Sequence, residues 1–320
     1  MRRLAVALAV TACAYAGHSS RPVSTASFIL EDAVRFAEVF ARLPSVADSA
    51  AFLDTAYVRK GSPGLRAYEA RYPLSGDGLV RAIRGFPQDY GSVGRRVNWL
   101  ATQEDTLRRV VERYSRVVPN AVLLPVYFVV GEHHGVNSGS EAGPLLSVEN
   151  GAAQIEKATL PELLAHEMTH IQQFSAVGLA RYRELYISRP WLLGVIIREG
   201  IAEFVAELVT GRVTQPRAKE YFDRNARPLW TELQNLLCST ENGDWVGGRP
   251  LDPSRPSSLG YAIGAEIARM YYRAARDKAE ALRTLISSDD YASIFLTSGF
   301  SEKYGMSRER VGAILAACGL

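Results

Sequence analysis

The sequence predicts an α+β fold that is mostly α, in which helices surround a small sheet. Two observations favour this class. Most segments with regular apolar spacing repeat with the helical period of 3.6, and only two short runs are rich in the β-branched and aromatic residues typical of strands. A chain of 320 residues can bury a large core, so we expect one main folded unit with a helical lead-in.

The N-terminal third predicts helices and one loop. Residues 31–43 and 99–118 combine helical periodicity with charge on one face, and residues 48–72 form a weaker helical pattern. Residues 73–95 are rich in glycine, proline and charge, which favours a loop. We therefore expect a helical region over residues 27–118.

The two strand-like runs follow this region. Residues 121–130 form an apolar run that ends at Gly131, and Pro125 inside it indicates an edge strand or a bulge. An edge strand offers free N–H and C=O groups to an extended peptide, but an internal core strand explains the apolar run equally well. Residues 145–148 predict a second short strand.

Helices dominate the rest of the chain. One begins at a capping box formed by Thr159 and Glu162 and should end at Gly178, and the next spans about residues 190–210 before Gly211. Residues 239–257 are rich in Gly, Pro and Asp, as in long loops that line clefts. Further helices are predicted at residues 219–237, 258–275, 278–286 and 307–317.

The segment LPELLAHEMTHIQQF contains the pattern H-E-x-x-H, formed by His166, Glu167 and His170. Two histidines four apart lie on one face of a helix, so both imidazoles can bind one ion, and Zn²⁺ favours such nitrogen ligands. Glu167 then lies beside the metal without binding it and can take a proton from the water that the metal activates. The pattern therefore predicts a zinc hydrolase in which Glu167 is catalytic.

The third metal ligand should be a carboxylate, because no histidine follows His170. Glu199, Glu203 and Glu207 recur every four residues in IIREGIAEFVAEL. Such a stripe is usually a solvated helix face, but the apolar residues on both sides of Glu199 indicate burial, and a buried carboxylate needs a partner such as a metal. We predict that His166, His170 and Glu199 bind Zn²⁺.

At these residues the chain resembles the glutamate-ligand zinc metallopeptidases, the gluzincins. It is similar in particular to a bacterial family of zinc-dependent proteases related to a gliding-motility lipoprotein. Four stretches between residues 126 and 272 come in the order of that family: VYFVVGEHHGVNSGS, HEMTHIQQF, REGIAEF and LGYAIGAEIARMYY. The resemblance implies a gluzincin-like catalytic region over residues 119–320 that hydrolyses a peptide or protein substrate with Zn²⁺ as cofactor.

The chain departs from the family at Glu132-His133-His134-Gly135, where a glycine-rich turn is usual. Adjacent residues on a strand face opposite ways, so at most one of these two histidines can join the metal site, and we expect both in a loop near the cleft. The gap between His170 and Glu199 is also longer than in thermolysin-like enzymes.

One further residue is a candidate for the site. Gly260 and Gly264 lie four apart at the start of a predicted helix, which indicates close packing against another helix. Tyr261 between them can then point at the metal and donate a hydrogen bond to an oxyanion, although a tyrosine packed in the core explains the pattern as well.

Two other functions compete with peptide hydrolysis. A non-catalytic envelope lipoprotein can keep such a fold as a binding or assembly module, but it should have lost Glu167 or a metal ligand, and every such position is filled here. A zinc hydrolase that acts on a different bond has the same sequence pattern, so the residues do not separate it from a peptidase.

The N-terminus predicts export. Residues 1–12 have a positive start and an apolar run too short to span a bilayer, as in a signal peptide. Val10-Thr11-Ala12-Cys13 fits the bacterial lipobox, in which Cys13 is lipidated and anchors the protein to a membrane of the cell envelope, with residues 13–26 as a tether. Ala14-Tyr15-Ala16 offers a competing cleavage site that would release a soluble exported protein.

The remaining composition adds two expectations. Cys238 and Cys318 form an even pair in an oxidising compartment, which favours a disulfide, while two buried free thiols are equally compatible with the sequence. The chain has 37 basic and 34 acidic residues, a net charge of +3, without a basic patch interleaved with aromatic residues. We therefore expect no nucleic-acid partner.

Overall fold

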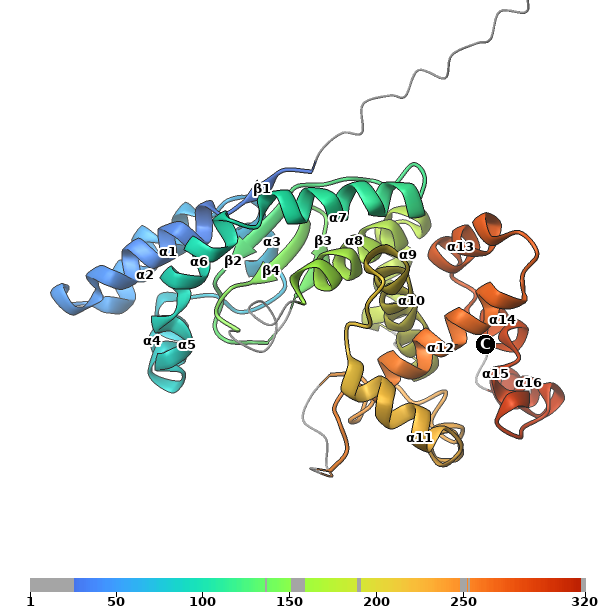
Figure 1. Ribbon diagram of the computed structural model, residues 1–320. Helices are drawn as coiled ribbons and strands as arrows, with labels where there is room; N and C mark the ends of the chain where they lie inside the picture. Colours follow the sequence, from blue (N-terminus) through green and yellow to red (C-terminus); the bar gives the residue numbers. More distant parts are fainter. Residues whose placement is uncertain are drawn as a thin grey trace, which may run out of the picture.

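The computed structural model describes residues 26–135, 137–150, 159–188, 191–247, 252 and 254–317. These residues form a mostly helical fold around a small sheet, so the predicted α+β, mostly α class is confirmed. Figure 1 shows the sheet and the N-terminal helices at one end of the molecule and the C-terminal helices at the other. Helices α8 (Leu160–Val177) and α10 (Leu192–Thr210) lie between these two ends. The predicted signal peptide, residues 1–12, and the predicted lipidation site Cys13 lie outside the described residues.

The sheet has four strands in the order β1-β2-β4-β3, with β3 antiparallel to β4 and the other pairs parallel. Strand β2 therefore lies inside the sheet. Of the two alternatives for this run, the internal core strand is confirmed and the edge strand is wrong. Pro125 lies just before β2, so its missing N–H does not interrupt the ladder. The strands are β1 (Phe28–Ile29), β2 (Val126–Val129), β3 (Ser138–Ser140) and β4 (Gly143–Ser147).

The first helices cover the sheet. Helix α1 agrees with its prediction, and the weak pattern of residues 48–72 becomes α2 and α3, which a 3-10 turn, Gly61 and Ser62 separate. Helices α1 and α3 both pack against β2. The elements are α1 (Glu31–Arg42), α2 (Ser49–Ala56), α3 (Pro63–Glu69) and two short 3-10 turns, Leu43–Ser45 and Val58–Lys60.

The predicted loop over residues 73–95 is helical instead. The Ser75 hydroxyl accepts a hydrogen bond from Gly78 N–H and caps α4, and Leu79 and Ala82 are buried on its inner face, so capping and burial outweigh the glycines. Helix α4 (Gly76–Gly85) is followed by α5 (Pro87–Gly91) and α6 (Val93–Ala101).

The helix predicted over residues 99–118 is interrupted. The N–H groups of Thr102 and Gln103 donate to the carbonyls of Trp99 and Leu100, each at 2.9 Å, and this tight turn ends α6. A separate helix, α7 (Glu104–Val117), follows. It packs against α8 and α10 and so connects the N-terminal half to the centre of the molecule.

The later helices follow the predictions in most cases. Thr159 precedes α8 as expected but makes no capping hydrogen bond, and Glu162 instead pairs with Arg212 at 3.0 Å, so the capping box is wrong. Short helices after Gly178 and Ser288 were not predicted. The remaining elements are α9 (Leu179–Arg183), the π-helical turn Glu184–Ser188, α11 (Pro216–Leu233), α12 (Leu259–Ala274), α13 (Lys278–Ser287), α14 (Tyr291–Ser298), α15 (Phe300–Lys303) and α16 (Arg308–Ala317).

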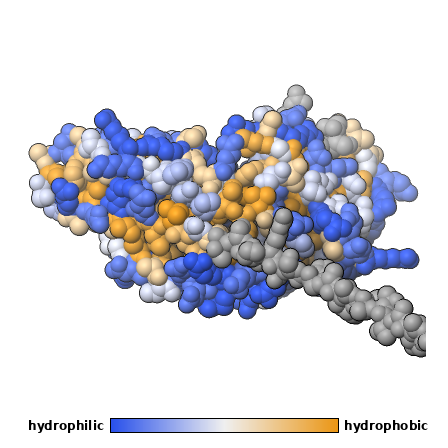
Figure 2. Space-filling view, turned by 90° about the horizontal axis from the view of Figure 1, so that it is seen from above, coloured by the Kyte–Doolittle hydropathy of each residue, from blue (hydrophilic) through white to orange (hydrophobic). Residues whose placement is uncertain are grey.

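Polar side chains cover much of the face shown in Figure 2, and apolar residues gather along its middle. Among the described residues, no helix is long and apolar enough to cross a membrane. Cys238 is disulfide-bonded, whereas Cys318, its predicted partner, lies outside the described part of the chain.

Candidate metal centre

Helix α8 carries two of the predicted ligands into the interior. It packs against β3, β4, α7 and α10, and His166, Glu167 and His170 are each at least 94% buried. Strand β3 can approach this helix closely because Gly139 has no side chain: a Cβ atom there would lie 3.0 Å from His170 Cβ. The polar face of α8 is therefore enclosed by protein, which is unusual unless those groups bind something.

Two glycines fix the position of α10. A Cβ atom at Gly264 would lie 2.0 Å from the carbonyl oxygen of Ile196, and one at Gly200 would lie 2.0 Å from the carbonyl carbon of Gly264. Helices α10 and α12 can cross at this distance only because both positions lack side chains. The spacing of Gly260 and Gly264 predicted close packing against another helix, and Gly264 lies at this crossing. Since Gly200 faces α12, the neighbouring Glu199 is free to face α8.

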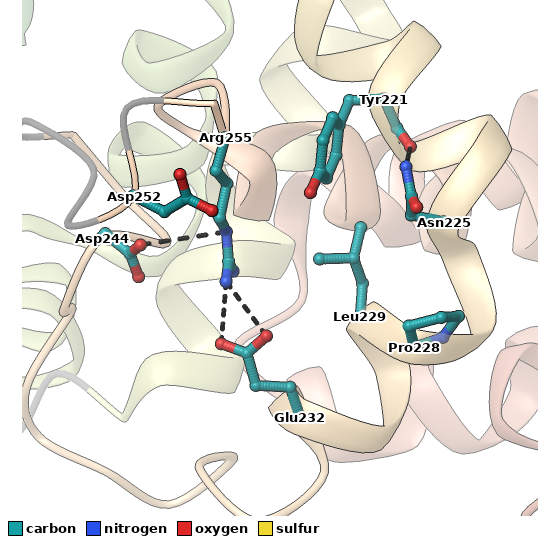
Figure 3. Close-up of a pocket in the computed structure, with 8 residues that line it drawn as sticks. All are labelled: Tyr221, Asn225, Pro228, Leu229, Glu232, Asp244, Asp252 and Arg255. Atoms are coloured by element: carbon teal, nitrogen blue, oxygen red, sulfur yellow. Dashed lines mark hydrogen bonds and ion pairs between the residues drawn. The ribbon is translucent and has the colours of Figure 1, made fainter.

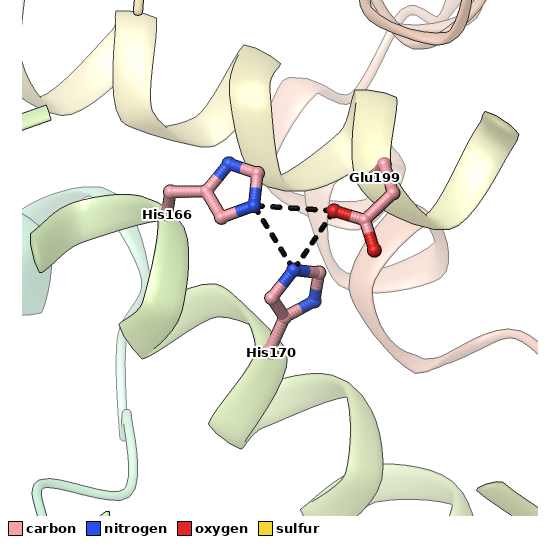
Figure 4. Close-up of side chains that lie close together, drawn as sticks. All are labelled: His166, His170 and Glu199. Carbon is pink, nitrogen blue, oxygen red and sulfur yellow. Dashed lines mark hydrogen bonds and ion pairs between the residues drawn. The ribbon is translucent and has the colours of Figure 1, made fainter. Parts of the chain in front are cut away.

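The three predicted ligands converge on one point, as Figure 4 shows. Glu199 Oε2 lies 3.3 Å from His166 Nε2 and 3.2 Å from His170 Nε2, and the two Nε2 atoms are 3.0 Å apart. Two ligand atoms that each lie 2.0–2.1 Å from a tetrahedrally coordinated ion are about 3.3 Å apart. The three side chains therefore have the spacing and the lone pairs to hold one metal ion.

Three further side chains hold these ligands in place. Gln173 Oε1 lies 2.7 Å from His170 Nδ1, while its amide nitrogen donates to the Arg198 carbonyl at 3.0 Å. Glu203 Oε1 lies 3.1 Å from His166 Nδ1. Arg198 donates to the second oxygen of Glu199. A partner on the far nitrogen of a histidine selects the tautomer that presents Nε2 to a metal.

Charged neighbours shift the pKa values of Glu199 and His166 in opposite directions. Burial alone would raise the pKa of Glu199, but Arg198 and the two histidines hold it well below its usual range. Burial likewise disfavours the charged form of His166, yet the carboxylates of Glu199 and Glu203 outweigh it and hold the pKa of His166 well above its ordinary value. A cation is therefore strongly stabilised at the point where these groups meet.

Glu167 lies beside the ligands without joining them. Its Oε2 atom accepts no hydrogen bond from any described residue, and burial raises the pKa of its carboxyl group, with the nearby histidines opposing that effect. A buried carboxylate with an unused oxygen next to a metal centre is available to exchange a proton with a small molecule there.

Tyr261 also lies at the centre. Its ring stacks against the His166 ring, with centroids 6.1 Å apart, and burial raises the pKa of its hydroxyl well above the ordinary value. The phenol is therefore a hydrogen-bond donor throughout the neutral range. His133 and His134 lie in the loop after β2, as expected, and they bind groups other than the metal ligands: His133 Nε2 lies 2.8 Å from Asp89 Oδ2, and His134 Nε2 lies 3.1 Å from the Pro73 carbonyl oxygen.

The sequence interpretation overlooked Gln173 and Arg198. Gln173 lies three residues after His170, on the same helix face, so the helical spacing contained that signal. Arg198 immediately precedes Glu199, but neighbouring helix positions normally point in different directions, and only the folded structure shows that its side chain returns to Glu199.

A cavity of about 300 Å³ lies between α11 and three described residues of the segment predicted as a loop, Asp244, Asp252 and Arg255 (Figure 3). Arg255 in this loop lies 2.9 and 3.0 Å from the two carboxylate oxygens of Glu232, and its guanidinium covers the ring of Trp245 at 4.4 Å. The loop therefore lines a cavity, as expected of such segments, but none of the metal-centre residues lines it.

No family model matches the chain, and neither the curated proteins nor the solved structures include a significant match to it.

Proposed function

We propose that the protein is a zinc-dependent peptidase of the gluzincin type. The observation that carries the proposal is the convergence of His166, His170 and Glu199 on one buried point, with Glu167 next to the first ligand on the same helix. Two imidazole nitrogens and one carboxylate are a common ligand set of catalytic zinc, and three protein ligands leave a fourth position for water or substrate.

The roles of the side chains follow from their positions. A bound zinc ion would polarise the scissile carbonyl group and lower the pKa of a water molecule toward neutrality. Glu167 accepts a proton from the attacking water and delivers it to the leaving amine, a role that a carboxyl group with a raised pKa suits. Tyr261 donates a hydrogen bond to the oxyanion that forms on the substrate.

Strand β3 is the element best placed to bind an extended peptide. Among the described residues it is a terminal strand of the sheet and pairs only with β4, and it packs against α8 at Gly139. An edge strand binds a peptide by adding its backbone as a further strand. The predicted peptide-binding edge therefore moves from residues 121–130 to β3.

A cleavage screen with a proteome-derived peptide library tests the proposal. The parent protein should cleave peptides, and Glu167→Gln should lose about 10²–10⁴-fold in turnover while it keeps its zinc, since general-base catalysis contributes that much. Glu162→Gln is the matched control, because Glu162 lies on the same helix but pairs with Arg212 and should leave cleavage unchanged.

Two results would contradict the proposal. Equal cleavage by the parent and by Glu167→Gln would remove Glu167 from the mechanism. A zinc-loaded parent that cleaves no peptide would favour a non-catalytic binding module or a hydrolase for another bond.

A further inference from the structure

The N-terminal region brings the side chain of Arg71 near the metal centre. Arg71 lies in the turn after α3, far in sequence from the zinc motif, and its side chain reaches β3. Its Nη1 atom donates to Ser138 Oγ at 2.9 Å and approaches the Gly139 carbonyl oxygen at 3.4 Å. The guanidinium is thus attached to the short strand that covers α8.

The Gly139 carbonyl lies where β3 meets the ligand helix α8. Its strand partner, Pro144, has no N–H and cannot donate to this carbonyl. On its other side Gly139 touches the ligand helix: a Cβ atom there would lie 3.0 Å from His170 Cβ and 3.6 Å from the Glu167 carbonyl oxygen. A peptide that pairs with β3 would therefore meet Arg71 beside the metal ligands.

The charge of Arg71 reaches the centre as well. The same charge opposes the effect of burial on the pKa of Tyr182, whose hydroxyl accepts from Arg198. The guanidinium is thus within electrostatic range of the residues around the metal.

Arg71 differs from the other arginine of this neighbourhood. Arg198 is mostly buried and already pairs with Glu199 and Tyr182. Arg71 is exposed, and none of the described carboxylates forms an ion pair with it. Its remaining N–H groups are therefore available to solvent or to a ligand, and a guanidinium fork matches a carboxylate in geometry and charge.

We propose that Arg71 is a specificity residue that binds a carboxylate of a peptide lying along β3. The carboxylate is either an acidic side chain close to the scissile bond or the free C-terminus of a short substrate. This inference rests on the proposed peptidase function, and it makes the N-terminal helical region part of the substrate site.

Peptides from the cleavage screen provide the test. Each cleaved peptide is resynthesised with its acidic side chains changed to amides, and separately with its C-terminus amidated, so the two sources of a carboxylate are distinguished. A charge-assisted hydrogen bond contributes about 1.5–3 kcal/mol, so the parent should prefer one carboxylate form by about 10–100-fold in kcat/KM. Arg71→Ala should abolish this preference, and Arg71→Lys should restore part of it.

A binding measurement makes the result independent of turnover. The same peptide pairs, labelled with a fluorophore, are titrated by anisotropy into zinc-loaded Glu167→Gln protein with and without Arg71→Ala. Arg66→Ala is the control, because Arg66 lies on α3 but is engaged with Glu69. We expect the carboxylate preference to disappear only with Arg71→Ala.

Equal binding of carboxylate and amide peptides, or a preference that survives Arg71→Ala, would overturn the inference. A parent that cleaves no peptide of the screen would contradict the peptidase proposal instead. The anisotropy titrations would then use library peptides in their carboxylate and amide forms, and the binding preference would still decide the role of Arg71.

Discussion

Glu149 provides a test of the folded interior that does not depend on the metal. This residue follows β4 and has no exposed surface. Arg96 Nη1 donates to the backbone carbonyls of Val148 and Glu149 at 3.0 and 3.2 Å. Burial raises the pKa of the Glu149 carboxyl group from the usual 4.5 to about 7, while neighbouring backbone N–H groups and Arg96 oppose that effect.

The raised pKa fixes the sign and the size of a stability effect. Between about pH 4.5 and pH 7 the folded protein holds a proton on Glu149 that the unfolded chain has lost, so stability falls as pH rises through this range. Each tenfold difference in proton affinity corresponds to about 1.4 kcal/mol, which gives a loss of about 3 kcal/mol above pH 7. Below pH 4.5 the carboxyl group is protonated in both states and this cost disappears.

The assay compares the parent with Glu149→Gln by urea denaturation from pH 4.5 to pH 8, in the presence of a chelator. The variant is neutral at every pH, so its free energy of unfolding should rise relative to that of the parent by about 3 kcal/mol between pH 4.5 and pH 7.5. The control is Glu69→Gln, because Glu69 is exposed. A difference between parent and Glu149→Gln that stays constant across this range would refute the reasoning.

Two other predictions concern the metal ligands and the packing behind them. Glu199→Ala should release the metal, whereas Glu203→Ala should weaken zinc binding by about 10–100-fold, because Glu203 only orients His166. Zinc titrations against a competing chelator measure both affinities, and the reverse order would exchange the roles of the two glutamates. Gly264→Ala should cost about 1–3 kcal/mol in unfolding free energy and weaken zinc binding, because the added Cβ forces α10 away from α12. Gly312→Ala should do neither, because a Cβ at Gly312 meets no atom within 4 Å. Equal thermal stability and equal zinc affinity of the two variants would contradict the close crossing.

The metal centre was predictable because two of its ligands form a pattern within one short stretch of sequence. His166 and His170 lie one helical turn apart, so their common face follows from the helical period alone. Glu199 required one more step, the expectation that an apolar segment buries its carboxylate. The glycine pair at Gly260 and Gly264 also predicted a close helix crossing, and Gly264 occupies it.

The parts that escaped prediction depend on distant contacts. Strand β3 reads Ser-Gly-Ser, without an apolar pattern, and exists because it pairs with β4 and lies against α8. Helix α4 contains glycines, which usually indicate a loop. Gly78 packs directly against the Glu132 carboxylate, and this contact leaves no room for a Cβ atom. Neither contact is visible in the residues of one segment.

The most direct test of the account is the metal content of the purified protein, measured by mass spectrometry after dialysis, together with its circular dichroism. We predict one zinc ion per chain in the parent and none in the His166→Ala/His170→Ala double variant, with the helical spectrum retained. A parent without zinc, or a double variant that keeps it, would contradict the assignment of the metal centre.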